Sequence, residues 1–140
     1  MKRAAAAAAL ALLLGVAQAS HAVAAPGWLP PSDLSVLGQD AEEPQVGVDS
    51  AGNAVAVWSR SNGSHTIIQA AVRPAGGTWG PVADLSAAGR DATEPQLAVD
   101  PAGNAVAIWS RSNGSHTIIQ AAGRSAGGPW SGSVDLSALG

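Results

Sequence analysis

The sequence predicts an all-β protein that consists of two four-stranded antiparallel sheets. The first observation behind this prediction is a 51-residue repeat, in which Ala51–Ala71 returns as Ala102–Ala122 with one change, Val57 to Ile108. The second is that short apolar runs alternate with clusters of turn residues. The third is that glycine and proline interrupt the chain every few residues after its N-terminal segment, which leaves no apolar helical periodicity.

Four strand-like segments follow one another in the first repeat, which spans residues 43–89. Gln45–Asp49 alternates apolar and polar residues and leads into a turn. Ala54–Arg60 is apolar on both faces, which predicts a strand that is covered on both sides. His65–Arg73 contains two adjacent isoleucines, and Trp79–Leu85 supplies the fourth segment.

The turn between the second and third segments carries the most specific local signal. Asn62-Gly63 stands between two strand-like runs, and Asn-Gly in that position is the strongest short-range signal for a β-hairpin. The second repeat, residues 94–139, has the same pair at Asn113-Gly114. We therefore expect the same four strands, with a β-hairpin at the same place, in each repeat.

The N-terminus has the composition of a secretory signal peptide. Two basic residues directly after the first methionine precede an apolar run at residues 4–16, which is too short to span a membrane. Small residues offer cleavage sites after Ala19 and Ala24. We expect a helical signal peptide over residues 1–24 and an exported, secreted protein.

The repeat also sets the expected boundaries between the parts of the chain. Residues 25–41 form a linker with a partial repeat, because Trp28–Ser35 matches the end of the repeat and predicts a lone fourth strand. Residues 42–89 and 90–140 form the two complete repeats.

The composition excludes several classes of function. Without the signal peptide the chain keeps five arginines and no lysine against ten acidic residues, so nucleic acid is not an expected partner. The chain has no cysteine, which excludes disulfides, thiolate metal sites and thiol nucleophiles. Tryptophan is the only aromatic residue type, so each of the five should matter for the core or for a ligand.

The repeat resembles the blade of a β-propeller. The segment that carries the resemblance runs from Pro44 to Trp58 and reads Pro-Gln-Val-Gly-Val-Asp-Ser-Ala-Gly-Asn-Ala-Val-Ala-Val-Trp. It is similar to the repeats of exported bacterial propeller-like proteins, and loosely similar to the Asp-box of sialidases and to NHL-type blades. The resemblance implies two four-stranded propeller-like blades preceded by a partial strand. Trp58 follows Asp49 by nine residues, which is farther than in a standard Asp-box.

Two repeats and one strand are too few to complete a propeller, which usually has four to eight blades. A single sheet would leave apolar faces in contact with water. We expect one of two solutions. Either copies of the chain self-associate, for instance three two-bladed chains in a six-bladed ring as in small fucose-binding propeller lectins, or the chain is a relic of a longer propeller.

One rim of the predicted sheets collects polar side chains, because the loop between the second and third strands emerges at the same edge as the connection to the next repeat. The candidate ligand-binding residues at this rim are Trp58, Asn62, His65, Arg90, Asp91, Trp109, Asn113 and His116. Polar donors beside an exposed indole suit sugar binding. The alternative is that the tryptophans pack in the core between blades and that the histidines bond within their hairpins.

The sequence predicts no catalytic residue, no metal and no cofactor. Asp49 and Asn53 could hold calcium, but their spacing lacks the alternating carboxylates of an EF-hand loop and equally suits an Asx-type turn. Glu42 with Glu43, or with Asp40, could form a glycosidase pair only if the separation of the carboxylates suited it. A tyrosine nucleophile of the sialidase type is absent from the sequence.

The expected function is that of an exported, non-enzymatic binding or interaction module, with extracellular carbohydrate as the favoured ligand class. Two alternatives stay open. One is a structural or vestigial propeller fragment with no ligand, and the other is a fragment of a sialidase-like glycan-processing enzyme. The expected partners are a glycan and further copies of the chain, with no nucleic acid and no membrane span.

Overall fold

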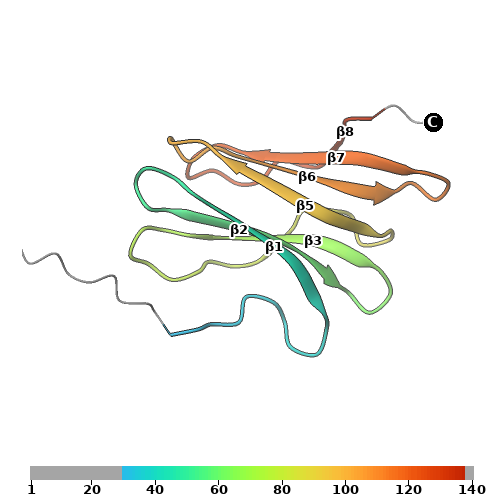
Figure 1. The fold of residues 1–140 in the computed structure, drawn as a ribbon, viewed down its shortest axis with the longest axis horizontal. Helices are drawn as coiled ribbons and strands as arrows, with labels where there is room; N and C mark the ends of the chain where they lie inside the picture. The colour runs from blue at the N-terminus through green and yellow to red at the C-terminus, as the bar shows by residue number, and fades with distance from the viewer. Residues whose placement is uncertain (1–29, 138–140) are drawn as a thin grey trace, which may run out of the picture. The chain divides into compact units, whose positions relative to one another are not determined.

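The computed structural model describes residues 30–137, and over that range the chain is all-β (Figure 1). Eight strands form two antiparallel sheets, each with its strands in sequence order. The N-terminal sheet consists of β1 (Ala41–Val48), β2 (Ala54–Ser61), β3 (Thr66–Arg73) and β4 (Ala83–Asp84). The C-terminal sheet consists of β5 (Ala92–Val99), β6 (Ala105–Ser112), β7 (Thr117–Arg124) and β8 (Val134–Asp135). The predicted all-β class with two four-stranded antiparallel sheets is confirmed, and within residues 30–137 the sheets do not close into a barrel or a ring.

Parts of the sequence prediction lie outside the described residues. The predicted signal peptide, residues 1–24, is among them, as are Trp28 and residues 138–140. Within residues 30–137 the structure contains no helix that could cross a membrane.

Both predicted hairpins are present. β2 pairs with β3 from Ser61 and Thr66 at the turn to Ala54 and Arg73 at the far end, and β6 pairs with β7 in the equivalent register. Gly63 in the first turn has φ +96°, a conformation that a residue without Cβ adopts at little cost.

β1 begins earlier than predicted, at Ala41 rather than at Gln45. The strand continues through a β-bulge, because its register against β2 shifts between Glu42 and Gln45 and Glu43 has φ +54°. Pro44 lies inside β1 although proline lacks the N–H that the ladder needs. The bulge accommodates the proline, as bulges do at irregular strand positions.

The fourth strand of each repeat is shorter than predicted. Only Ala83–Asp84 joins the ladder in the first repeat, whereas the prediction began at Trp79. Gly80 still donates its backbone N–H to the Val72 oxygen at 2.8 Å, and the equivalent Ser131 donates to the Gly123 oxygen at 2.7 Å. The pairing then stops before β4 and β8 alike, although Pro81 of the first repeat is Gly132 in the second.

The predicted lone strand at Trp28–Ser35 is wrong for the part that the structure describes, since residues 30–35 form no strand. Pro30 and Pro31 have no N–H groups to offer a neighbouring strand. Leu34 nevertheless packs against the cluster that contains Trp58, and its repeat equivalent Leu85 lies in the cluster that contains Trp109.

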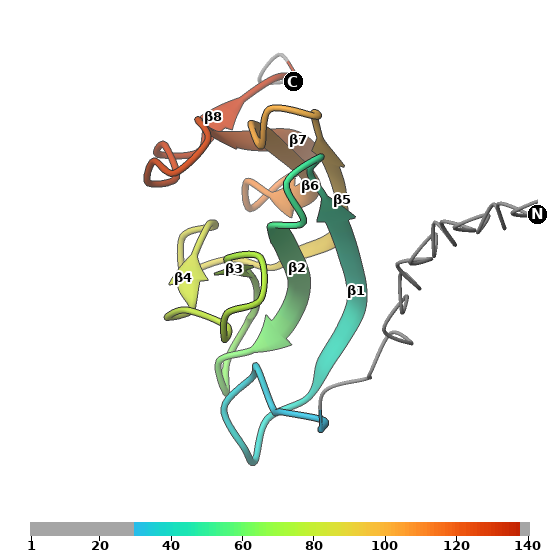
Figure 2. The ribbon, with the colours of Figure 1, turned by 90° about the vertical axis from the view of Figure 1, so that its left-hand side faces the viewer.

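The two sheets pack face to face, with β1 beside β5 (Figure 2). Their shared core contains Val57, Ile68, Ala70 and Leu85 from the N-terminal sheet and Ala92, Ala107, Trp109 and Ala122 from the C-terminal sheet. Because side chains alternate across a strand, Trp58 lies on the other side of β2 from Val57. It forms a second cluster there with Ala56 and Ala71.

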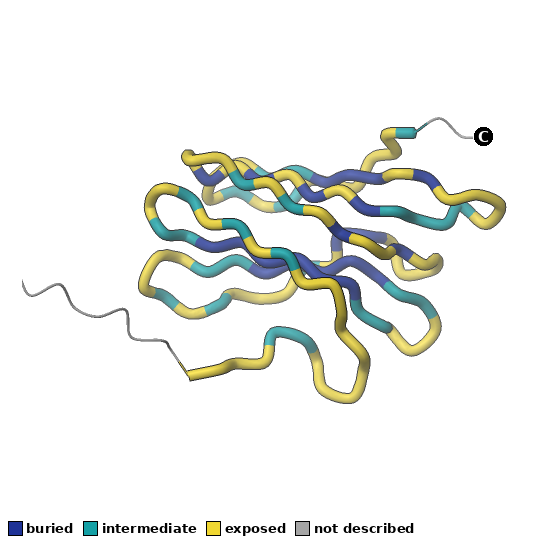
Figure 3. Tube along the Cα trace, in the orientation of Figure 1, coloured by how far each residue is buried: buried dark blue, intermediate teal, exposed yellow. Residues whose placement is uncertain are grey.

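The same sequence pattern is buried differently in the two sheets. Residues Ala54 to Ser59 of β2 are all buried (Figure 3), which confirms the prediction of a strand covered on both sides. β6 has nearly the same sequence, but its apolar residues are buried only at alternate positions. Only one face of β6 meets the other sheet, so the opposite face stays open to solvent.

Candidate functional site

Asn62 and Asn113 organise the two hairpin turns. The Asn62 Oδ1 accepts the backbone N–H groups of Ser64 at 3.0 Å and His65 at 2.9 Å, and its Nδ2 donates to the Ala88 oxygen at 3.0 Å. The Asn113 Oδ1 accepts the equivalent N–H groups of its own turn at 2.9 and 2.8 Å. These amides therefore hold the turns in shape, which is the usual role of an Asx side chain in a loop.

The structure brings His65 and Asp91 together at the first hairpin. The Asp91 Oδ1 accepts the Thr66 backbone N–H at 2.9 Å and lies 3.3 Å from the His65 Nδ1. The hydrogen bond from Thr66, followed by the bond and charge of His65, lowers the pKa of Asp91 against the opposing effect of desolvation. Asp91 precedes β5, so this contact joins the second repeat to the hairpin of the first.

Arg90 lies on the other hairpin. A Cβ built on Gly114 would clash with the Arg90 guanidinium, so the arginine lies directly against the tip of the β6–β7 turn. The connection that contains Arg90 and Asp91 thus lies between the two hairpin turns, as the predicted rim requires. His116 is exposed at the second turn.

The two candidate tryptophans are not at the rim. Trp58 and Trp109 are 5% and 1% exposed, and each belongs to a core cluster. The Trp109 Nε1 donates to the Gln120 Oε1 at 3.3 Å. The alternative that placed these side chains in the core is confirmed, and neither indole offers a free face on which a sugar could stack.

The residues considered for calcium form Asx-type turns. The Asp49 Oδ1 accepts the Ala51 and Asn53 N–H groups at 2.9 Å, and its Oδ2 accepts the Asn53 Nδ2 at 2.7 Å. The bond from the Asn53 side chain is the main reason why the pKa of Asp49 is lowered. Asp100 makes the same bonds with Asn104, at 2.8 and 2.7 Å, and its pKa is lowered in the same way.

Among the residues considered for glycosidase chemistry, Glu43 uses its carboxylate in a contact with another residue, whereas Asp40 and Glu42 use their backbone oxygens. The Glu43 Oε2 accepts the Ser59 hydroxyl at 3.1 Å, and the backbone oxygens of Asp40 and Glu42 accept Ser61 N–H and Ser59 hydroxyl groups at 2.9 and 3.1 Å. Within residues 30–137 no three His, Asp or Glu side chains converge as a metal site would require.

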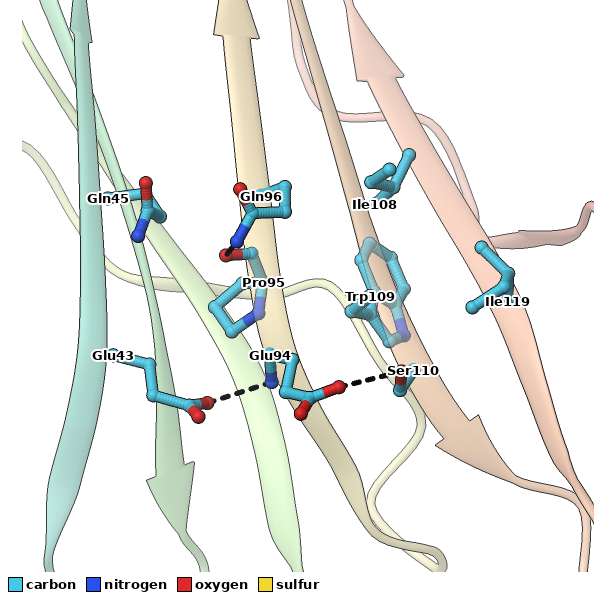
Figure 4. A pocket seen from close by; sticks show the side chains of 9 residues that line it. All are labelled: Glu43, Gln45, Glu94, Pro95, Gln96, Ile108, Trp109, Ser110 and Ile119. Carbon is cyan, nitrogen blue, oxygen red and sulfur yellow. Dashed lines mark hydrogen bonds between the residues drawn. The ribbon is translucent and has the colours of Figure 1, made fainter.

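Glu43 also links the two sheets. Its Oε2 accepts the backbone N–H of Glu94, the equivalent residue one repeat later, at 2.8 Å (Figure 4). The Glu94 Oε2 in turn accepts the Ser110 hydroxyl at 3.2 Å. Both glutamates occupy β-bulges with positive φ, so we call them the bulge glutamates. They line an open hollow of about 570 Å³ that extends to Ile108 and Ile119.

One face of the C-terminal sheet is apolar and open. Val106 is 51% exposed where its equivalent Val55 is 2% exposed, and Leu136 is 59% exposed where Leu85 is 6% exposed. We call this surface the C-face; it consists of Val106, Ile108, Ile119, Val134 and Leu136. The corresponding face of the N-terminal sheet is covered by the C-terminal sheet, whereas nothing in the described residues covers the C-face.

Sequence reasoning missed both the bulge glutamates and the C-face as functional features. The double-sided apolar pattern of Ala54–Arg60 and its repeat was the available signal for the C-face. It showed that both faces need cover, but it could not show which of the two repeats lacks it. No sequence pattern predicted the contact between Glu43 and Glu94, because it depends on a β-bulge that the sequence did not indicate.

No known protein family, curated protein or solved structure matches the chain.

Proposed function

We propose that this exported chain is a non-catalytic interaction module, built from two propeller-like blades, that binds its partner through the C-face. The observation that carries the proposal is the contrast between equivalent residues. Val106, Ile108 and Ile119 are exposed, while the residues one repeat earlier form the core. A contiguous apolar sheet face of this kind is typical of a protein interaction surface.

The carboxylates support a structural role for the polar residues rather than catalysis. The pKa values of Asp49, Asp91 and Asp100 are all lowered by hydrogen bonds from their own or neighbouring turns. Glu43, from the pair considered for glycosidase chemistry, accepts the Ser59 hydroxyl and the Glu94 N–H instead. A glycan-processing fragment is therefore the weaker alternative.

Carbohydrate remains the alternative ligand class, now without the proposed stacking on Trp58 and Trp109. Its support is the set of polar groups at the second hairpin turn, where Asn113 is half-buried and His116 is exposed. The amide oxygen of Asn113 is already used within the turn, which leaves few groups for sugar hydroxyls. The apolar C-face is the larger unpartnered surface, so we place the binding function there.

The test measures whether a partner protects the C-face. Because the chain has no cysteine, Ile108→Cys and Ser115→Cys each introduce a single thiol, one on the C-face and one at an exposed turn. The rate of reaction with a thiol reagent is followed while unlabelled chain, up to about 100 μM, or soluble oligosaccharides are added. Slower reaction at Ile108→Cys alone is expected.

The outcomes separate the kinds of partner. Protection by unlabelled chain supports both the C-face and self-association, whereas protection by an oligosaccharide alone supports the C-face with carbohydrate as its ligand. If Ile108→Cys reacts as fast as Ser115→Cys under every condition, the C-face is not a binding surface and the proposed function is overturned.

A further inference from the structure

The chain carries a second open apolar surface, on the N-terminal sheet. Ala41, Val46 and Val48 are exposed there, and we call them the N-face. Their equivalents one repeat later are Ala92, Leu97 and Val99. Ala92 lies in the core between the sheets, Leu97 packs against that core and Val99 lies against Gly47.

The two open faces are therefore copies of the two halves of an interface that the chain already contains. Within the chain, residues equivalent to the C-face pack on residues equivalent to the N-face. Val57, Ile68 and Leu85 contribute one half. Ala92, Ala107, Trp109 and Ala122 contribute the other, with Leu97 packed against them.

The repeat has left the C-face as an uncovered copy of the first half. The copy of the second half is partly covered, because Ala41, Val46 and Val48 are exposed but Trp58 and its neighbours are buried with Leu34 packed against them. Leu136 of another copy would therefore have to replace Leu34.

We propose that the C-face of one copy of this chain binds the N-face of a second copy, so that the packing of the two sheets continues head to tail between chains. This inference rests on the proposed function, because it names the partner of the C-face. A contact that joins two different surfaces is heterologous, and its repetition closes a ring or extends a filament.

Polar contacts between the repeats support this choice of partner. In the repeated packing, the Glu94 carboxylate would accept the backbone N–H of Glu43 of the second copy, as Glu43 accepts that of Glu94 within the chain. Asp40 of the second copy would correspond to Asp91. Its carboxylate would accept the Thr117 N–H and lie beside His116, as Asp91 accepts the Thr66 N–H and lies beside His65. All these groups are exposed, so their pairing requires no buried charge to be created.

The equivalence is incomplete, because Ala98, Ile108, Val134 and Val46 replace Gly47, Val57, Ala83 and Leu97. The replacement of Gly47 is at the tightest contact. Gly47 faces Val99 so closely that a Cβ on the glycine would clash with the valine side chain, and it would lie 3.7 Å from the Leu97 Cδ2. On the C-face side the equivalent residue is Ala98. The second copy presents Val46 in place of Leu97, which frees some volume, but its Val48 must shift to clear the Ala98 methyl group.

The experiment uses one charged substitution on each face. Val46→Asp blocks the N-face and Ile108→Asp blocks the C-face, with Val106→Asp as a second C-face variant and Ser115→Asp as a charge control at an exposed turn. The molar mass of each purified chain is measured by light scattering at about 1 to 100 μM. Circular dichroism and thermal unfolding establish that each variant is folded.

The expected result has a signature that only head-to-tail binding gives. The unmodified chain and Ser115→Asp associate, and each face variant alone is monomeric, because every contact needs one intact face of each kind. An equimolar mixture of Val46→Asp and Ile108→Asp then forms a 1:1 dimer, since the first supplies an intact C-face and the second an intact N-face.

Three results would overturn the inference. The first is a folded, unmodified chain that is monomeric at about 100 μM. The second is association that persists in Val46→Asp alone, which would indicate contacts between two C-faces. The third is the absence of a dimer in the mixture. A monomer whose Ile108→Cys thiol is protected by an oligosaccharide would refute self-association while leaving the proposed function intact.

Discussion

At the scale of single residues, whether a side chain is buried depends less on its position in the repeat than on whether another sheet packs over it. Val55 and Val106 are the same residue in the same strand context, yet the first is buried and the second is exposed. Side-chain partners differ as well. The Trp109 Nε1 bonds to Gln120, whereas the Trp58 Nε1 has no hydrogen-bond partner in the described part of the chain.

The aspartates with lowered pKa values predict a loss of stability in acid. Their ionised forms are favoured in the folded state, so they stabilise it above the ordinary pKa of 3.8. That contribution disappears as the pH falls through the lowered values. We expect the free energy of unfolding, measured with urea, to decrease from about pH 5 downward. The decrease should be smaller in Asp91→Asn, which keeps an acceptor for Thr66 but cannot titrate.

The comparison is made between the slopes of the two proteins against pH. An Asp91→Asn variant that is folded at neutral pH and loses stability in acid as steeply as the unmodified chain would contradict this account of Asp91.

At the scale of structural elements, the β-bulge is the device that connects one repeat to the next. Its positive φ value at Glu43 is sterically unfavourable for a residue with a side chain. The bulge interrupts the β1–β2 ladder, and the Glu43 side chain reaches the Glu94 N–H of the adjacent sheet. The local strain is therefore associated with a contact between sheets, and it occurs in both repeats.

The bulge glutamates predict different effects of the same substitution. Glu43→Ala removes the acceptor for both Glu94 N–H and the Ser59 hydroxyl, and we expect it to lower the free energy of unfolding by about 1 kcal/mol. Glu94→Ala loses only the Ser110 hydroxyl and should cost less. Glu43→Gln retains an acceptor oxygen and should recover much of the loss. Urea unfolding measures all three.

Equal effects of Glu43→Ala and Glu94→Ala would show that the contact between the sheets contributes nothing, since that contact is the difference between the two residues in the monomeric chain. The measurement is made at low concentration, so that contacts between copies do not contribute.

At the scale of the whole molecule, two stacked sheets leave two unlike apolar faces. Covering the C-face would remove several half-exposed aliphatic side chains from water, each worth about 1 kcal/mol at that degree of exposure. That gain is large relative to the stability of a small domain. Head-to-tail association would provide it without any new kind of contact.

Head-to-tail association predicts that removal of the Ala98 methyl group changes the affinity between copies. Ala98→Gly restores the residue that permits close packing at Gly47 within the chain, so we expect it to tighten association by about tenfold. The chain itself should become slightly less stable, because glycine in a strand costs about 0.5 to 1 kcal/mol. The dissociation constant is measured by sedimentation, with Ala88→Gly at an exposed loop as the control.

Weaker or unchanged association in Ala98→Gly would show that Ala98 does not lie at the contact between copies. The Ala88→Gly control excludes a general effect of added chain flexibility.

Local sequence signals located most of the strands, but not their ends. Asn62-Gly63 fixed the first hairpin because turn conformation depends on the turn residues themselves. The start of β1 was missed because a bulge accommodates Pro44. The fourth strand was overestimated in both repeats, whether Pro81 or Gly132 stands before it. Both errors concern how far a strand stays paired, which depends on the partner strand as well as on the strand's own residues.

The candidate site was predictable only for residues that lie in or next to the predicted turns. The polar rim forms because Arg90 and Asp91 lie in the connection between repeats, next to hairpin turns that the sequence located. Trp58 and Trp109 were included as possible sugar platforms, and the structure places both in the core. An apolar alternation shows that a tryptophan lies on one side of a strand, but not whether another sheet covers that side.

The sequence by itself determined the repeat, the four strands of each sheet and the hairpin turns, because hydrogen-bonded ladders and turns form between residues that are close in the chain. Only the tertiary structure decided which copy of each apolar residue is buried, because burial depends on a sheet that lies one repeat away. Val57 and Ile108 occupy equivalent positions, but only Val57 has another sheet packed over it. The surface to which we assign function follows from that difference.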